Sequence, residues 1–219
     1  MRTTLPRIVT AAALALACSL SLSAQKTAPT KTPAKAAAAP AKLGPGTYAV
    51  FNTSKGSFKA QLFPKDAPKA VANFVALAEG KQPYKDPRMG TLSMAPLYQS
   101  LLFFRTIPGY LIQTGDPLNN GTGKLGYTLP FEKNSLKFDQ PGRMALAQVP
   151  GDASSRGSQV FFTLKPVPAL DSGGYLIIGQ IVDGLDVAQA LSEGARKNGA
   201  QDIPQYPNIL QSVKIQVVQ

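Results

Sequence analysis

Short apolar or alternating runs separated by turn residues dominate the chain after about residue 45. Residues 48–52 and 57–62 flank a turn at 53–56 and predict a β-hairpin. Further short β-prone runs follow at 101–106, 110–114, 143–147, 159–164, 175–182 and 212–218. Because these runs are short and regularly interrupted, the pattern predicts a mainly β domain in which many strands form a barrel.

Two segments show the periodicity of a helix instead. In the first, apolar residues recur at the spacing of one helix face, at Val71, Phe74, Val75 and Ala78. Asp66 is the expected N-cap of this helix and Gly80 its expected C-terminal stop. Residues 185–192 predict a second, shorter helix. Residues 81–96 contain Pro, Gly and Met and predict a loop.

The start of the chain has a different pattern. Residues 1–24 combine two arginines, an apolar run and a small-residue cleavage site, which predicts a cleavable secretory signal. The apolar run is too short to predict a membrane span. Residues 25–44 are an Ala/Pro/Lys stretch with too little apolar content to repay the entropy of ordering, so we predict a disordered linker. The folded domain is therefore expected over residues 45–219.

Cys18 leaves a second interpretation of the signal open. In a lipoprotein signal, Cys18 would be lipidated after Ala15-Leu16-Ala17, although a residue such as Leu is usual where Ala15 stands. Plain cleavage after Ala24 is the favoured interpretation for that reason. Both interpretations predict an exported protein, periplasmic or extracellular.

Composition limits the chemistry that this chain can perform. Its net charge is +11, but residues 45–219 hold 17 basic against 12 acidic residues, so much of the excess lies outside the predicted domain. No basic helix or aromatic RNA motif accompanies the charge, and we expect no nucleic-acid partner. The absence of His, with a single Cys, excludes Ser-His-Asp triads and His or multi-thiolate metal sites. Catalysis would therefore depend on Arg, Lys, carboxylates, Tyr, amides or the backbone.

Several separated blocks of the domain carry a family resemblance. Residues 103–116 read FFRTIPGYLIQTGD, residues 157–162 read GSQVFF, and residues 175–184 read YLIIGQIVDG. Together with the stretch at 53–80, these blocks resemble the cyclophilins, in the same order along the chain. The resemblance implies a closed eight-stranded antiparallel barrel capped by two helices. It also implies a peptidyl-prolyl cis-trans isomerase that needs no cofactor and acts on proline-containing polypeptides.

Isomerisation of X–Pro bonds suits a chain without His. Amide resonance gives the peptide bond a rotational barrier of about 18–20 kcal/mol, and no covalent bond has to break to cross it. A catalyst needs only to favour the twisted amide, in which the prolyl nitrogen regains a lone pair. A fixed guanidinium can donate a hydrogen bond to that nitrogen and remains charged throughout.

The resemblance also assigns residues to this chemistry. It makes Arg105 the guanidinium, Gln113 the residue that orients it and contacts substrate, and Tyr110 a wall of the proline pocket. The implied substrate-binding residues are Leu111, Ala147, Gln148, Gln159, Phe161, Leu170 and Tyr175.

Four positions depart from the family pattern. Phe104 stands where many members have His, Tyr110 where they have Phe, Thr114 where they have Gly, and Ala169 where cyclosporin-sensitive members have Trp. Because the large indole and its hydrogen bond are missing at Ala169, we expect weak binding of cyclosporin.

Alternative functions remain open at this point. The leading interpretation is a monomeric isomerase that speeds the folding of exported proteins. A second is a module that grips Pro-containing segments on the same fold with little catalysis. A third is a scaffold that binds a partner through residues 81–96.

The run GTGKLG at 121–126 matches G-x-G-x-x-G, but a poor helix former follows it, so we predict a turn and not a nucleotide site.

Overall fold

The computed structural model describes residues 43–148 and 155–219. These residues belong to one compact unit, Ala39–Gln219. The predicted signal at 1–24, including Cys18, and nearly all of the predicted linker at 25–44 lie outside the described residues. No helix in the described ranges is long and apolar enough to cross a membrane.

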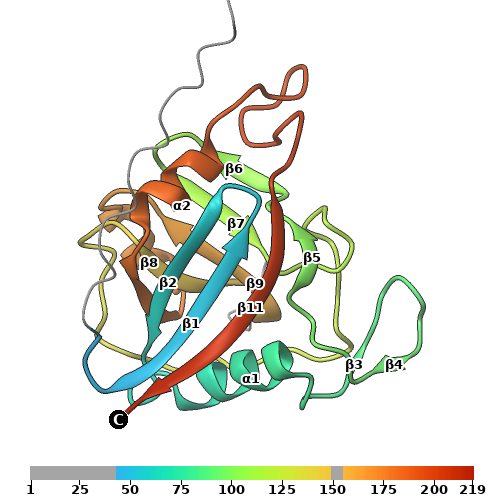
Figure 1. The fold of residues 1–219 in the computed structure, drawn as a ribbon, viewed down its shortest axis with the longest axis vertical. Helices are drawn as coiled ribbons and strands as arrows, with labels where there is room; N and C mark the ends of the chain where they lie inside the picture. The colour runs from blue at the N-terminus through green and yellow to red at the C-terminus, as the bar shows by residue number, and fades with distance from the viewer. Residues whose placement is uncertain (1–42, 149–154) are drawn as a thin grey trace, which may run out of the picture. The chain divides into compact units, whose positions relative to one another are not determined.

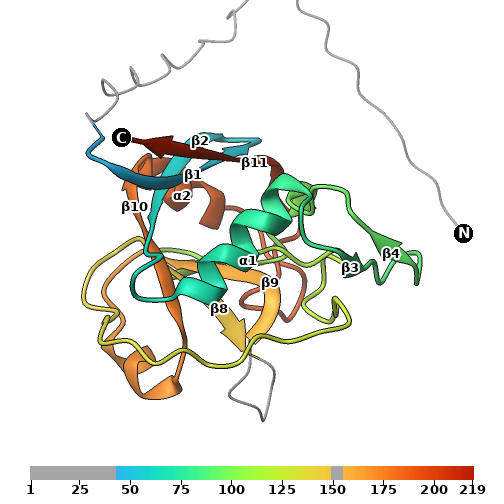
Figure 2. The same cartoon turned by 90° about the horizontal axis from the view of Figure 1, so that it is seen from below.

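Nine strands form one curled antiparallel sheet (Figures 1 and 2). In the order of the sheet they are β5 (Gln99–Leu102), β11 (Ile209–Val218), β1 (Gly46–Thr53), β2 (Gly56–Leu62), β10 (Ile177–Asp183), β8 (Arg143–Gln148), β9 (Ser155–Thr163), β7 (Leu111–Thr114) and β6 (Arg105–Ile107). Every ladder between neighbouring strands is antiparallel. The predicted mainly β, antiparallel, barrel-like architecture with two capping helices is confirmed.

The expected detail of a closed, eight-stranded barrel is wrong. The sheet has nine strands, and its two end strands, β5 and β6, form no ladder with each other in the described part of the chain. Only Phe103 and Phe104 separate these strands in the sequence. The N–H of Phe103 donates to the carbonyl of Asn208 at 2.9 Å, whereas Arg105 already pairs with Gln113 of β7. One bent segment therefore supplies both edges of the sheet, because its first strand pairs with β11 and its second with β7.

Side chains join the edge strand β5 to β7, the strand next to the other edge. The hydroxyl of Thr114 on β7 donates to the carbonyl of Leu102 on β5 at 2.9 Å. The N–H of Leu102 donates to the side-chain oxygen of Asn119 at 2.7 Å. Thr114 is fully buried. The residue that departs from the family pattern at this position thus ties β7 to the other edge.

Two α-helices lie at opposite ends of the curled sheet (Figure 1). The shorter one, α2 (Leu185–Ser192), has the predicted bounds. In α1 (Pro68–Glu79) the predicted apolar face is buried at Val71, Phe74 and Ala78 and half-buried at Val75. The helix ends at Gly80 in the left-handed conformation, as predicted.

The predicted N-cap of α1 is wrong. The N-cap residue is Ala67 and not Asp66, and no side-chain hydrogen bond is made from the cap position. The carboxylate of Glu132 lies there instead and accepts the N–H groups of Lys69 at 3.0 Å and Ala70 at 2.8 Å. A carboxylate at a helix N-terminus satisfies orphan donors and complements the helix dipole, so no local cap is needed.

Aromatic side chains fill the interior of the curled sheet. The rings of Phe51 and Phe58 stack at 4.7 Å, and Phe162 meets both edge-on at 5.1 Å. Phe74 of α1 joins this group at 6.1 Å from Phe51.

Residues 81–96, predicted as a loop, also contain a two-stranded ladder between β3 (Tyr84–Lys85) and β4 (Leu92–Ser93).

Replacement of Thr114 tests the link between the sheet edges. We expect Thr114→Val to lower the free energy of unfolding by about 1 kcal/mol, because the variant keeps the side-chain shape and loses the hydrogen bond to Leu102. Urea denaturation followed by circular dichroism measures the change. Thr114→Ser retains the hydroxyl and is the matched control. A valine variant as stable as the unmodified protein would show that this bond does not hold the edges together.

Candidate active site

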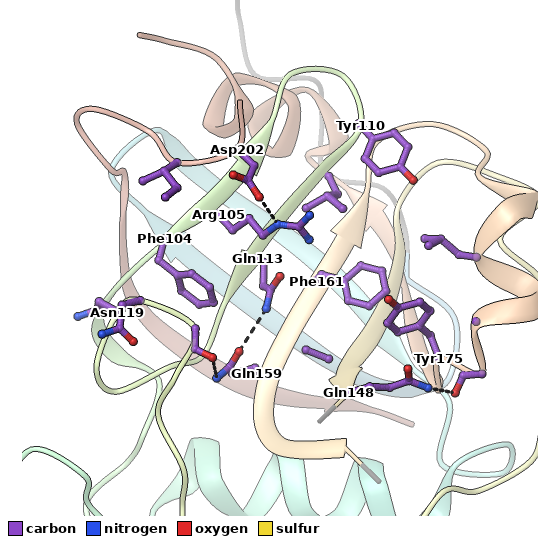
Figure 3. Close-up of a pocket in the computed structure, with 18 of the residues that line it drawn as sticks. Phe104, Arg105, Tyr110, Gln113, Asn119, Gln148, Gln159, Phe161, Tyr175 and Asp202 are labelled. Carbon is purple, nitrogen blue, oxygen red and sulfur yellow. Dashed lines mark hydrogen bonds and ion pairs between the residues drawn. The ribbon is translucent and has the colours of Figure 1, made fainter. Parts of the chain in front are cut away.

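A pocket of about 1080 Å³ opens beside strands β6, β7, β8 and β9. All ten residues that the sequence assigned to catalysis or substrate binding line it: Arg105, Tyr110, Leu111, Gln113, Ala147, Gln148, Gln159, Phe161, Leu170 and Tyr175. Residues up to 70 positions apart therefore meet at one surface of the sheet. The pocket has an apolar side and a polar side (Figure 3).

A small aromatic cluster forms the apolar side. The ring of Phe161 meets Tyr175 edge-on at 5.2 Å and stacks on Phe138 at 5.9 Å. On β9, Phe161 faces this cluster while its neighbour Phe162 enters the main core, as strand alternation requires. The cluster is separate from the main core, and partly buried Tyr110, Leu170 and Tyr175 pack against it. Its exposed surface offers aromatic and aliphatic contacts to a small apolar ring.

Tyr110 forms the rim of the pocket on this side. The ammonium of Lys165 lies 5.3 Å from the centre of the Tyr110 ring, a distance at which a cation is attracted to an aromatic face. The N–H of Leu164 donates to the carbonyl of Tyr110 at 2.8 Å. Both contacts join the rim to the end of β9.

Arg105 is the cation of the polar side. It lies opposite Gln113 in the ladder between β6 and β7. Its Nε donates to Oδ2 of Asp202 at 2.8 Å, and the Arg105 and Asp202 side chains are 41% and 38% exposed. In Figure 3 the two terminal nitrogens of Arg105 point away from Asp202, toward the side of the pocket that holds Phe161.

Gln113 makes a different contact from the one with Arg105 that the family resemblance led us to expect. Its amide nitrogen donates to Oε1 of Gln159 at 3.2 Å, and the amide of Gln159 donates to the carbonyl of Gly121 at 3.3 Å (Figure 3). Both glutamines are buried. The polar wall therefore consists of two linked amides beside the guanidinium.

The backbone around Gln159 is fixed by hydrogen bonds from three directions. The hydroxyl of Ser158 donates to the carbonyl of Gly115 at 2.7 Å, and Tyr98 donates to the carbonyl of Ser158 at 2.9 Å. Asn73 of α1 donates to the carbonyl of Gly157 at 2.7 Å. Gly115 has φ +89°, and a Cβ there would lie 2.2 Å from the carbonyl oxygen of Ser158, so only glycine fits.

Tyr127 supports this frame from behind. Its hydroxyl donates to Oδ1 of Asn73 at 2.7 Å. Burial raises the pKa of Tyr127 to about 12, so the phenol stays protonated and remains a donor at neutral pH. Asn73 is thereby held in the orientation that bonds Gly157.

Asp116 holds the loop of residues 117–123, which follows β7 and contains the Gly121 carbonyl bound by Gln159. Its buried carboxylate accepts the N–H groups of Leu118, Asn120, Gly121 and Gly123. The G-x-G-x-x-G run at 121–126 falls in this loop, and no helix follows it. Residues 121–126 form an irregular stretch with bends at Gly121 and Gly126, not the predicted turn, and the strand–motif–helix arrangement of a dinucleotide site is missing from this described segment.

Another part of the rim joins β8 to the 3-10 helix η1 (Pro168–Gly173). The side chain of Gln148, at the end of β8, donates to the carbonyl of Gly174 at 2.7 Å. Leu170 of η1 and Tyr175 after it line the pocket there. Ala169 is exposed on η1 next to Leu170.

The pocket also contains residues that the sequence did not single out. Lys197, Asp202 and Ile203 come from the segment between α2 and β11. That segment lies outside the family blocks and has the polar composition of an ordinary exposed loop. No local spacing links Asp202 to Arg105, 97 positions earlier. In the described ranges, no group of three or more His, Cys, Asp or Glu residues is placed to hold a metal ion.

Comparison with known proteins places this fold and pocket in a family. A family model described as "Cyclophilin type peptidyl-prolyl cis-trans isomerase/CLD" matches residues 48–215. The chain is 37% identical to peptidyl-prolyl cis-trans isomerase B of Streptomyces anulatus over 173 residues, which cover 77% of this chain and 96% of the relative. It is 36% identical to peptidyl-prolyl cis-trans isomerase A of Mycobacterium tuberculosis over 171 residues, covering 76% and 91%.

A solved structure agrees with these relatives. The crystal structure of a Cryptosporidium parvum cyclophilin type peptidyl-prolyl cis-trans isomerase, obtained in the presence of the dipeptide Ala-Pro, matches with a TM-score of 0.65. The match has 27% sequence identity and covers 78% of this chain and 99% of that chain. The family model, the sequence relatives and the solved structure all agree, so the chain belongs to the cyclophilin type peptidyl-prolyl cis-trans isomerases.

Proposed function

We propose that this isomerase acts on X–Pro bonds of exported proteins while they fold, with Arg105 as the group that stabilises the twisted amide. The observation that carries the assignment is the position of Arg105. Its terminal nitrogens face a pocket whose opposite side is the Phe161 cluster. A prolyl ring seated on that cluster presents its nitrogen to a permanent cation.

The mechanism follows from how amide charge changes during rotation. As the C–N bond twists, resonance is lost and the prolyl nitrogen becomes a hydrogen-bond acceptor. A guanidinium already fixed in place donates to that nitrogen more strongly in the twisted state than in either planar state. A thousandfold acceleration requires only about 4 kcal/mol of such differential stabilisation out of a barrier of about 18–20 kcal/mol.

The remaining pocket residues hold the chain on either side of the rotating bond. Tyr110, Leu111 and Phe161 are the proposed contacts of the prolyl ring. The side-chain amides of Gln113, Gln148 and Gln159 and the backbone at Ala147 are the proposed partners of the substrate main chain. The Ala-Pro dipeptide used with the Cryptosporidium parvum structure supports a proline-containing peptide as the ligand class.

The site of action is proposed from the beginning of the chain. Residues 1–24 have the charged start, apolar run and small-residue end of a secretory signal. Residues 25–44 would then separate the domain from the membrane or the wall. Lipidation of Cys18 is the competing interpretation of the same segment.

Removal of the cation tests the catalytic assignment. We expect Arg105→Ala to lower kcat/KM for a short X–Pro peptide about 10²- to 10³-fold, because a preorganised donor to the transition state is lost. The rates are measured by NMR exchange spectroscopy on the purified protein. Arg105→Lys keeps the charge but loses the planar fork, and its activity should lie between the two. The assignment fails if folded Arg105→Ala isomerises the peptide as fast as the unmodified protein.

Ala169 provides a test through an inhibitor. We expect cyclosporin to bind with a dissociation constant above about 1 μM, because the pocket rim lacks an indole at this exposed position. Ala169→Trp should tighten binding by about tenfold or more, measured by calorimetry. Submicromolar binding to the unmodified protein would contradict this expectation.

Mass spectrometry of the exported protein tests the signal. We expect the mature chain to begin at Gln25 when the full sequence is expressed in a bacterium with an intact secretion system. Cys18→Ser should not change that mass. A lipidated chain beginning at Cys18, lost in the serine variant, would favour the lipoprotein interpretation instead.

A further inference from the structure

The segment between α2 and β11 has a defined structure of its own. Its two arms pair like a small hairpin through Lys197 N–H to the Ile203 carbonyl at 3.0 Å and Gln205 N–H to the Ala195 carbonyl at 2.9 Å. An isolated antiparallel bridge joins Arg196 and Pro204 between these contacts. Residues 195–205, here named the positioning loop, are therefore held together by their own backbone contacts. They lie between α2 and β11 (Figure 1).

The positioning loop is attached to the free edge of β6. The N–H of Thr106 donates to the backbone carbonyl of Asp202 at 2.9 Å. The guanidinium of Arg196 donates to the hydroxyl of Thr106 at 3.0 Å and also to the carbonyl of Ser192 at the end of α2. Because β6 is the last strand of the sheet, this loop covers an edge that no strand covers. The backbone of Asp202 is thus fixed next to Arg105.

The side chain of Asp202 uses this fixed backbone to hold Arg105. Its Oδ2 accepts Nε–H of Arg105 at 2.8 Å. Arginine has five N–H donors, one on Nε and four on the terminal nitrogens, so a carboxylate bound at Nε leaves the four terminal donors for another acceptor. Figure 3 shows those terminal nitrogens directed away from Asp202 and into the pocket. Among the described residues, Asp202 is the one side chain that bonds Arg105.

We propose that Asp202 is a positioning residue, which fixes the plane of the Arg105 guanidinium so that its terminal nitrogens face the prolyl nitrogen of the substrate. The proposal rests on the catalytic role proposed above for Arg105. Both side chains are more than one third exposed, so solvent screens their charges and the attraction between them is weak. The contribution of Asp202 is therefore orientation, which limits the rotamers of a long side chain before the substrate binds.

If Asp202 only orients Arg105, its removal should change kcat and leave KM nearly the same. Loss of orientation weakens an interaction that develops in the transition state, so it lowers kcat and leaves KM nearly unchanged. We expect Asp202→Ala to reduce kcat about tenfold and to change KM by less than about twofold, which corresponds to about 1.4 kcal/mol of transition-state stabilisation. Asp202→Asn keeps one acceptor oxygen and should lose less activity.

A double-mutant cycle with Arg105→Ala shows whether Asp202 acts through Arg105. The four proteins are the full chain, each single variant and the double variant, assayed on one X–Pro peptide. Asp202→Ala should reduce kcat in the unmodified background and have no further effect beside Arg105→Ala. Asn198→Ala, at the exposed tip of the same loop, is the matched control and should leave kcat and KM unchanged.

The Nε–H signal of Arg105 in a ¹H–¹⁵N spectrum gives a second readout. It is assigned by its loss in Arg105→Ala, and in Asp202→Ala it should move toward the position of a solvated arginine and exchange faster with water. Urea denaturation of each variant shows whether the loop still holds its edge of the sheet.

The outcomes distinguish this proposal from the assignment of Arg105. If Arg105→Ala keeps its activity, the catalytic assignment itself fails. If Arg105→Ala loses activity while folded Asp202→Ala keeps its kcat, the positioning role alone is overturned. Equal losses from Asp202→Ala in both backgrounds would also overturn it, because Asp202 would then act independently of Arg105.

Discussion

The bend between β5 and β6 is the constraint on which the rest of the structure depends. One short segment pairs with β11 at its start and with β7 at its end, so it brings the two edges of a nine-stranded sheet together. Arg105 follows the bend directly. The bend that brings the two edges of the sheet together therefore also sets the position of the cation on the pocket wall.

The pocket combines an apolar and a polar environment on one surface of the sheet. Strand alternation on β9 turns Phe161 out of the main core and into a second aromatic cluster, which gives an apolar seat. The polar side consists of the guanidinium of Arg105 on β6 and the linked amides of Gln113 on β7 and Gln159 on β9. An isomerase needs this pairing, since the prolyl ring is apolar and the nitrogen that it carries becomes a hydrogen-bond acceptor only when the amide twists.

Local patterns predicted the parts of the molecule that depend on local interactions. Periodicity predicted the bounds of α2 and the apolar face of α1, and glycine chemistry predicted the stop of α1 at Gly80. The family blocks predicted ten residues that all line the pocket. The failures involve partners that are distant in sequence. Glu132 replaces a local cap from more than 60 positions away, and Asp202 reaches Arg105 from the far end of the chain. Nothing near either residue encodes such a contact, which exists only once the sheet has curled.

The most direct test of the account is a crystal structure of the protein with an Ala-Pro-containing peptide. We predict that the prolyl ring lies against Phe161 and Leu111, with the prolyl nitrogen within about 3.5 Å of a terminal nitrogen of Arg105. Asp202 should remain bound to Nε in the complex. A proline seated outside the aromatic cluster, or an Arg105 guanidinium turned away from the prolyl nitrogen, would contradict the electrostatic mechanism.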